Sequence, residues 1–195
     1  MRTTVGCRVK SGWAVAVLLG GRADAPRVLD RRRLELSEPE VPESVQPYHA
    51  SFGTEQTDTA AVERLVRLVT RRAERSVAQL VRDCRAGGHR PARIGVVATS
   101  TVDPASIANQ HIRAHASEGR LFRTVVEEAA RRHGLEPVIL LERDLLASAA
   151  RLLGRTPARV RKAVADLGRG IDGSWRAEDK SAALAAWVLL ARRGP

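Results

Sequence analysis

The sequence has few of the residues on which several common kinds of protein depend. Its two cysteines, Cys7 and Cys84, are too few for a disulfide framework or a Cys-only zinc site, and they favour a reducing, intracellular setting. Aromatic residues make up only 3% of the chain, so a core has to be built from aliphatic side chains. No apolar run reaches the about 18 residues of a membrane helix. The N-terminus lacks the apolar stretch of a secretory signal, and we expect a cytoplasmic location with no membrane contact.

Positive charge is in excess. The 195 residues include 33 Lys and Arg against 22 Asp and Glu, for a formal net charge of +11. Three of the 33 are Lys and the other 30 are Arg. Such a basic chain is typical of nucleic-acid partners, but a GC-rich genome also raises Arg and Ala at the expense of Lys, so both explanations stay open. With 44% hydrophobic residues the chain can form a sizeable core, and its length predicts one domain over 1–195.

Hydrophobic patterns predict the secondary structure. Val-rich alternation and turn residues predict antiparallel strands over 3–8, 12–19 and 27–36. Short apolar runs at 93–99 and 136–142 predict strands buried on both faces. Helices are predicted over 58–86, 103–133, 143–153, 157–167 and 176–192, and the proline-rich segment 37–57 is predicted to be a long loop. Because the last two strands alternate with helices, they should be parallel. The fold class is therefore α/β, with a mixed five-stranded sheet flanked by helices.

Three local patterns carry a resemblance to a known family. Ser11-Gly12-Trp13-Ala14-Val15 has the Gly-aromatic start of a second strand, and Val96-Val97-Ala98 lies where a fourth strand would be. Residues 177–186 are similar to a closing acidic helix of pattern Asp-x-x-Asp-Ala-Leu-Ala. Together with the order of elements, these patterns resemble the RNase H-like superfamily and, within it, the RuvC-type Holliday junction resolvases.

The resemblance implies a catalytic site that this sequence does not complete. The family cleaves with two divalent metal ions on about four carboxylates. The first strand ends in Arg8-Val9-Lys10 with no acid, and the fourth ends in Thr99-Ser100. In the last helix Asp179 matches the first Asp, but Ala182 replaces the second. Glu178 points about 100° away from Asp179 on the helix.

Asp179 and Glu178 are therefore the candidate catalytic residues, and Asp179 is the candidate metal ligand, with Mg²⁺ or Mn²⁺ implied only if the chain is active. The other interpretation of Asp179 is a first-turn acid that the helix dipole favours.

Basic residues supply the candidates for nucleic-acid binding. The densest uncompensated stretch lies in residues 155–169, and Lys10 and the Arg31–Arg33 run add to it. The alternative for Lys10 is a solvated residue in a turn. The alternative for the Arg31–Arg33 run is an edge strand whose charges prevent pairing with other strands. The scarcity of aromatic residues disfavours base stacking on single strands, so structured or duplex DNA or RNA is the expected partner. The candidates are Lys10, Arg31, Arg33, Arg155, Arg159, Arg161, Lys162 and Arg169.

One further pattern involves histidine. His111, His115 and Glu118 lie at i, i+4 and i+7, on one face of a predicted helix. This spacing suits a transition metal, but no fourth ligand is near in sequence and His49 is a speculative addition. Because so short a motif often arises by chance, chance placement is the favoured interpretation.

Three hypotheses follow. The first is a RuvC-like nucleic-acid-binding protein that has lost the two-metal nuclease site. The second is an active metal-dependent endonuclease with a rearranged site of Asp179, Glu178, Glu142 and Asp103. The third is a pseudoenzyme that binds other proteins. The resemblance to resolvases is consistent with a homodimer, and the sequence leaves open whether the chain is an enzyme.

Overall fold

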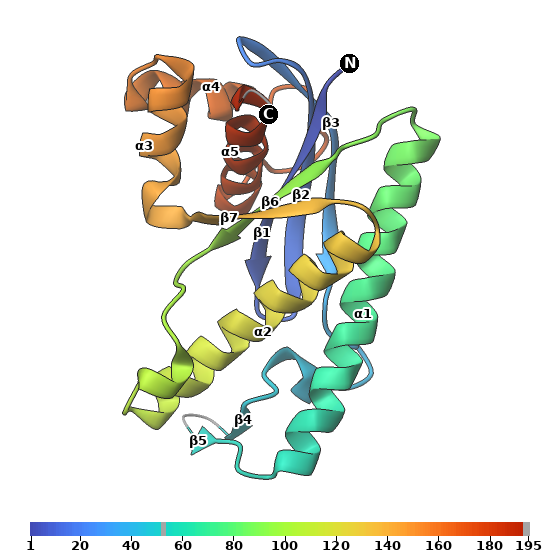
Figure 1. The fold of residues 1–195 in the computed structure, drawn as a ribbon, viewed down its shortest axis with the longest axis vertical. Helices are drawn as coiled ribbons and strands as arrows, with labels where there is room; N and C mark the ends of the chain where they lie inside the picture. Colours follow the sequence, from blue (N-terminus) through green and yellow to red (C-terminus); the bar gives the residue numbers. More distant parts are fainter. Residues whose placement is uncertain (52–53, 193–195) are drawn as a thin grey trace.

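Five strands form the central sheet of the computed structural model, which describes residues 1–51 and 54–192 (Figure 1). Three of them form an antiparallel meander: β1 (Thr3–Lys10), β2 (Trp13–Arg22) and β3 (Ala25–Glu35). Two more run parallel to β1: β6 (Arg93–Ala98) and β7 (Glu136–Leu141). The order across the sheet is β3-β2-β1-β6-β7. This arrangement confirms the predicted α/β fold with a mixed sheet.

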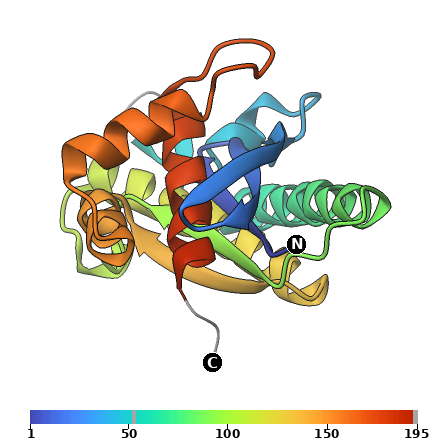
Figure 2. The ribbon, with the colours of Figure 1, turned by 90° about the horizontal axis from the view of Figure 1, so that it is seen from above.

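Helices cover both faces of the sheet. One face packs against α1 (Thr59–Ala86) and α2 (Gln110–Arg132). The other packs against α3 (Glu142–Leu153), α4 (Pro157–Asp166) and α5 (Ala177–Ala191). Figure 2 shows α5 on one side of the meander strands and α1 on the other. Within the described residues, no helix combines the length and the apolar character that a membrane crossing requires.

The core is aliphatic, as the composition predicts. On the face toward α1 and α2, alternate residues of β1 such as Val5 and Cys7 are fully buried. On the opposite face α5 is the central helix, since every residue from 182 to 190 is buried. Trp187 lies inside this second cluster, and its indole N–H donates to the carbonyl oxygen of Ala23 at 2.7 Å. Trp187 is therefore a core residue.

Helix α5 lies directly on the backbone of β1. A Cβ atom added to Gly6 would lie 1.8 Å from the carbonyl oxygen of Ala182 and 2.6 Å from the amide nitrogen of Ala186. Real Cβ atoms do not approach backbone that closely, so only glycine fits here. The contact sets the distance between the sheet and the middle of α5.

The structure corrects three predicted segments. The helix predicted over 103–133 begins only at Gln110, because Asp103 caps a single 3-10 turn, η2 (Pro104–Ser106), and Asn109 then caps α2 with its own side chain. Strand β7 is not buried on both faces, because it is the edge of the sheet, and it ends one residue earlier since Glu142 begins α3.

The predicted loop 37–57 is also partly regular. It contains a 3-10 turn, η1 (Pro42–Val45), and two short antiparallel strands, β4 (His49–Ser51) and β5 (Thr54–Glu55). Arg113 of α2 donates two hydrogen bonds to the Glu55 carboxylate, at 2.6 and 3.1 Å. The guanidinium also holds the pKa of Glu55 below its usual range. This ion pair attaches the β4–β5 hairpin to the N-terminal half of α2.

Both thiols are expected to be unreactive in the native protein. Cys7 is completely buried, and that burial raises the pKa of its thiol to about 12. Burial also raises the pKa of Cys84. Because the thiolate is the reactive form, a raised pKa lowers the reactive fraction of each thiol at pH 8. An aromatic disulfide reagent at pH 8 should therefore label neither residue until a denaturant is added, and should then label both. Rapid labelling of the native chain would contradict this burial.

Candidate functional site

A cavity of about 480 Å³ opens at the carboxyl ends of β1 and β6, against α2. In open α/β sheets this edge is where ligands commonly bind. Its strand side is formed by the ends of the two strands and the residues that follow them, and its helix side by α2 from Ile112 to Arg123. The charged residues of the lining are all basic: Arg8, Lys10, Arg120 and Arg123. No Asp or Glu lines the cavity among the described residues.

Arg8 is the central side chain of this site. Its side chain is only 9% exposed, although it carries a full charge. Its guanidinium donates to the Glu142 carboxylate at 2.8 Å, to the Thr99 hydroxyl at 3.3 Å and to the Val9 carbonyl at 3.1 Å. Thr99 directly follows β6 and Glu142 directly follows β7, so Arg8 links the ends of three neighbouring strands. A fixed cation thus occupies the strand end where the resemblance implies the first carboxylate.

Asp179 lies at the start of α5 with both carboxylate oxygens engaged. It is 1% exposed, and its Oδ1 accepts from Arg31 Nε at 2.6 Å. Its Oδ2 accepts from the backbone N–H of Arg176 at 2.7 Å, which completes a capping box. Ala182, one turn further along, is fully buried against β1. These contacts attach the first turn of α5 to the edge strand β3.

The residues at this edge do not fit two Mg²⁺ ions, which need several oxygen ligands. Glu178 is next to Asp179 but on another side of the helix. Glu142 is paired with Arg8, and Asp103 is paired with Arg120 at 3.0 Å. In the part of the chain that the structure describes, no three carboxylates offer oxygens within 4.8 Å of one another.

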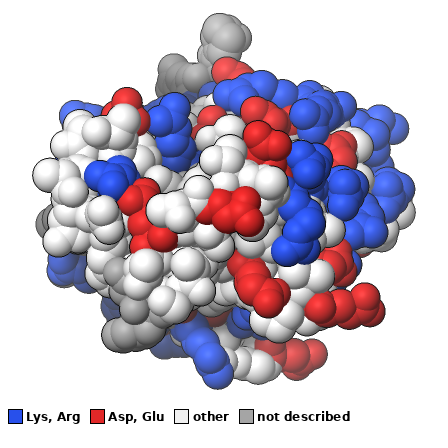
Figure 3. Space-filling view, turned by 90° about the horizontal axis from the view of Figure 1, so that it is seen from below, with Lys and Arg blue, Asp and Glu red and all other residues white. Residues whose placement is uncertain are grey.

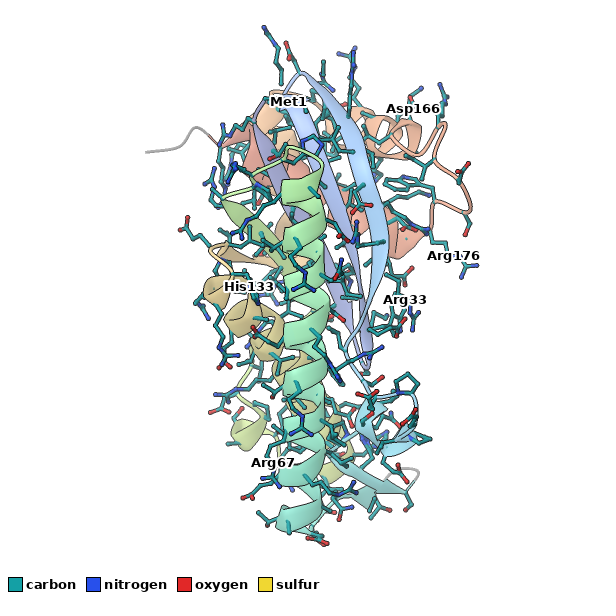
Figure 4. All side chains as sticks on the ribbon, turned by 90° about the vertical axis from the view of Figure 1, so that its right-hand side faces the viewer. Met1, Arg33, Arg67, His133, Asp166 and Arg176 are labelled. Atoms are coloured by element: carbon teal, nitrogen blue, oxygen red, sulfur yellow. The ribbon has the colours of Figure 1, made fainter. Side chains whose placement is uncertain are left out.

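The predicted basic residues fall into three places. Lys10 lines the cavity. Arg31 pairs with Asp179, whereas Arg33 pairs with Glu35 at 2.6 Å and lies over the ring of Trp13 at 4.4 Å. The remaining five lie between α3 and α4, on α4 and just after it: Arg155, Arg159, Arg161, Lys162 and Arg169. In Figure 4, Arg33, Asp166 and Arg176 lie along one flank of the molecule.

The positive charge of residues 155–169 is more fully compensated in the structure than the sequence indicates. Asp166 accepts from Lys162 at 2.7 Å and pairs with Arg169 at 2.9 Å. Arg155 donates to the carbonyl oxygen of Asp24 at 3.2 Å. Elsewhere, Figure 3 shows blue side chains gathered on the right with red ones among them, and α1 lies on that side in Figure 1. Exposed ion pairs such as Arg67 with Glu63 explain this mixture.

A histidine cluster lies at the α2 side of the cavity. His49 of β4 joins His111 and His115 of α2, with ring centroids 4.4 to 5.5 Å apart. The Nδ1 atom of His49 lies 2.6 Å from Oε1 of Glu118. Glu118 is fully buried, and burial raises the pKa of its carboxyl, although the hydrogen bond to His49 opposes the rise. The sequence favoured chance placement for the pair on α2, but the structure brings a third histidine to it.

Comparison with known proteins identifies the class to which the fold belongs. No family model matches the sequence, and no curated protein is similar enough to be matched. Solved structures do match. RuvC of Thermus thermophilus in complex with a Holliday junction substrate superposes with a TM-score of 0.60 at 11% identity, covering 96% of this chain and 92% of that one. The free Thermus thermophilus RuvC gives 0.59 at 11% identity, covering 95% and 92%.

A yeast mitochondrial Holliday junction resolvase, Ydc2, is also matched, with a TM-score of 0.44 at 11% identity over 96% of this chain and 77% of that one. The chain has the RNase H-like fold. Within that class its architecture is RuvC-like, as the sequence predicts. At 11% identity the likeness to these two structures shows the fold alone.

Proposed function

We propose that this RuvC-like chain binds structured or duplex nucleic acid, DNA or RNA, through phosphate contacts and does not cleave it by the two-metal reaction. The observation that carries the proposal is the basic cavity. At the edge of the sheet where the fold's nucleases place carboxylates, the charged lining is Arg8, Lys10, Arg120 and Arg123. Phosphate groups are the natural partners of such a cluster.

The individual side chains support separate roles. Arg8 is buried and fixed by three acceptors, so its guanidinium is held in one orientation in the cavity lining, with the Glu142 carboxylate offsetting part of its charge. Lys10 is exposed and forms no ion pair with any described residue, so it is free to meet a phosphate. Arg120 is exposed and forms an ion pair with Asp103.

The same charges oppose metal-dependent cleavage. Mg²⁺ at this edge would have to approach the Arg8 guanidinium, and the one matching acid, Asp179, is already bonded to Arg31 and to the start of α5. We therefore infer that the metal-binding function of the fold is replaced here by anion binding. A cytoplasmic location and a homodimer also stay predictions.

The proposal predicts salt-dependent binding that the cavity residues control. Anisotropy of labelled four-way junction, duplex and single-stranded DNA or RNA, measured at several KCl concentrations, should show the tightest binding to the structured ligands. The double variant Lys10→Ala/Arg120→Ala removes two phosphate contacts, so the slope of log K against log salt should fall by about 2. A matched variant, Arg131→Ala/Arg132→Ala, removes the same charge from the far end of α2 and should leave the slope nearly unchanged.

Lys162→Ala/Arg169→Ala tests whether the stretch 155–169 also contributes. Absence of binding at low salt would reject the proposal and leave the protein-interaction hypothesis. Cleavage that requires Mg²⁺ or Mn²⁺ and disappears in Asp179→Ala would reject the proposed loss of two-metal cleavage. It would favour the rearranged carboxylate site.

A further inference from the structure

The histidine cluster has the composition and proximity of a metal centre. His49, His111 and His115 each offer one ligand nitrogen, and these nitrogens lie within 4.8 Å of one another. Among the described residues, this is the one group of three or more His, Cys, Asp or Glu with that proximity. His111 and His115 are one helical turn apart on α2, and His49 arrives from the hairpin that the Glu55–Arg113 pair attaches to the same helix.

Glu118 orients His49 in the way that metal-bound histidines are usually oriented. One ring nitrogen, Nδ1, is bonded to the buried Glu118 carboxylate at 2.6 Å. The other, Nε2, is buried and has no hydrogen-bond partner within the described structure, in a side chain only 7% exposed. A buried polar atom without a partner is costly and unusual. When Nδ1–H donates this hydrogen bond to the carboxylate, the neutral ring carries its lone pair on Nε2, and this is the form that binds a metal.

Glu118 also faces His115. Its Oε2 lies 3.6 Å from Nδ1 of His115, is buried and accepts no hydrogen bond from any described residue. Positive charge nearby stabilises the ionised form of a fully buried carboxylate. A divalent ion bound to the histidines would provide that charge.

We propose that His49, His111 and His115 form a three-histidine site for a divalent transition metal, with Zn²⁺ as the reference ion and Glu118 as the residue that orients the ligands. Imidazole nitrogens suit Zn²⁺ and its neighbours, whereas Mg²⁺ and Ca²⁺ prefer oxygen ligands. Zn–N bonds of about 2.0–2.1 Å in tetrahedral geometry place the nitrogens roughly 3.4 Å apart. Rotation of the two α2 imidazoles can supply that adjustment.

The site is open on one side. The side chain of His115 is 48% exposed, and Ile112, between the two α2 histidines, is 55% exposed. Three protein ligands with a solvent-facing fourth position are typical of zinc sites that hold a water molecule. His115 also lines the basic cavity, so the ion would lie at the edge of that cavity. The site rests on the histidine geometry alone and does not depend on nucleic-acid binding.

Titration of the chelator-treated full chain with Zn²⁺, followed by calorimetry, tests the proposal. We expect one ion per chain and a higher Tm with Zn²⁺. Co²⁺ should give the visible absorption bands of a four-coordinate site. His111→Ala/His115→Ala, in which alanine preserves the helix, should lower the affinity at least about 100-fold and remove the Tm shift. Glu118→Gln should lower it about 10- to 100-fold.

The chain offers a matched control in His133, which follows α2 and bonds Glu74 at 2.7 Å. His133→Ala should bind Zn²⁺ as the wild type does. Equal affinity and equal Tm shift in His111→Ala/His115→Ala and the wild type would show that the ion binds elsewhere and would overturn the proposal. So would the absence of stoichiometric binding by a wild-type chain whose circular dichroism shows that it is folded.

Discussion

Gly6→Ala is expected to lower the free energy of unfolding by about 3 kcal/mol, the upper part of the range for overpacked cores. The added methyl carbon would lie 1.8 Å from the carbonyl oxygen of Ala182. Because the obstructing atoms belong to the backbone of α5, no side-chain rotation relieves the clash, and the helix has to move away from β1. Urea unfolding followed by circular dichroism measures the loss.

Gly119→Ala is the matched control for this variant. Gly119 is in α2 and an added Cβ would meet nothing within 4 Å, so alanine should stabilise the chain by about 0.5–1 kcal/mol through helix propensity. If Gly6→Ala were as stable as the wild type, α5 could not lie as close to the sheet as the structure has it. The position of Asp179 beside β3 would then be in doubt as well.

The sheet was predictable because its signals are local. The β1–β2–β3 meander is encoded by Val-rich alternation with glycine turns, and the parallel strands by short apolar runs between helices. What the sequence did not reveal is the place of each strand in the sheet. Strand β7 has the composition of a buried strand, yet it lies at the edge of the sheet and its Ile139 is 36% exposed. The position of a strand depends on the elements that pack beside it, and composition does not reveal these.

The candidate sites were harder to predict, because they join residues distant in sequence. The sequence indicates separate roles for Arg31 and Asp179, and nothing local indicates that they form a pair across 148 residues. His49 is 69 residues from Glu118 and lies outside the helix that carries the other two histidines, so no helical spacing connects it to them. The basic lining of the cavity was partly visible, since the absence of acids at the first strand was clear, whereas Arg120 and Arg123 carried no signal beyond their charge.

Arg31→Met is expected to destabilise the chain more than Asp179→Ala does. Without Arg31, the Asp179 carboxylate stays 1% exposed and keeps one backbone N–H, that of Arg176, so an uncompensated buried charge costs about 3–5 kcal/mol. Without Asp179, the Arg31 side chain, already 29% exposed, can turn toward water. The loss is then that of a helix cap and a charged hydrogen bond, about 1–3 kcal/mol.

Arg22→Met is the control for this comparison, since Arg22 bonds Asp24 in a pair exposed on both sides and its loss should not change stability measurably. The double variant Arg31→Met/Asp179→Ala should resemble Asp179→Ala, because removing the buried carboxylate also removes the penalty for its missing partner. A metal-ligand role for Asp179 predicts the opposite order: Asp179→Ala would abolish metal-dependent activity at little cost in stability, and Arg31→Met would leave the carboxylate free to bind an ion. Urea unfolding of the four variants therefore distinguishes a carboxylate that supports the fold from one that serves catalysis.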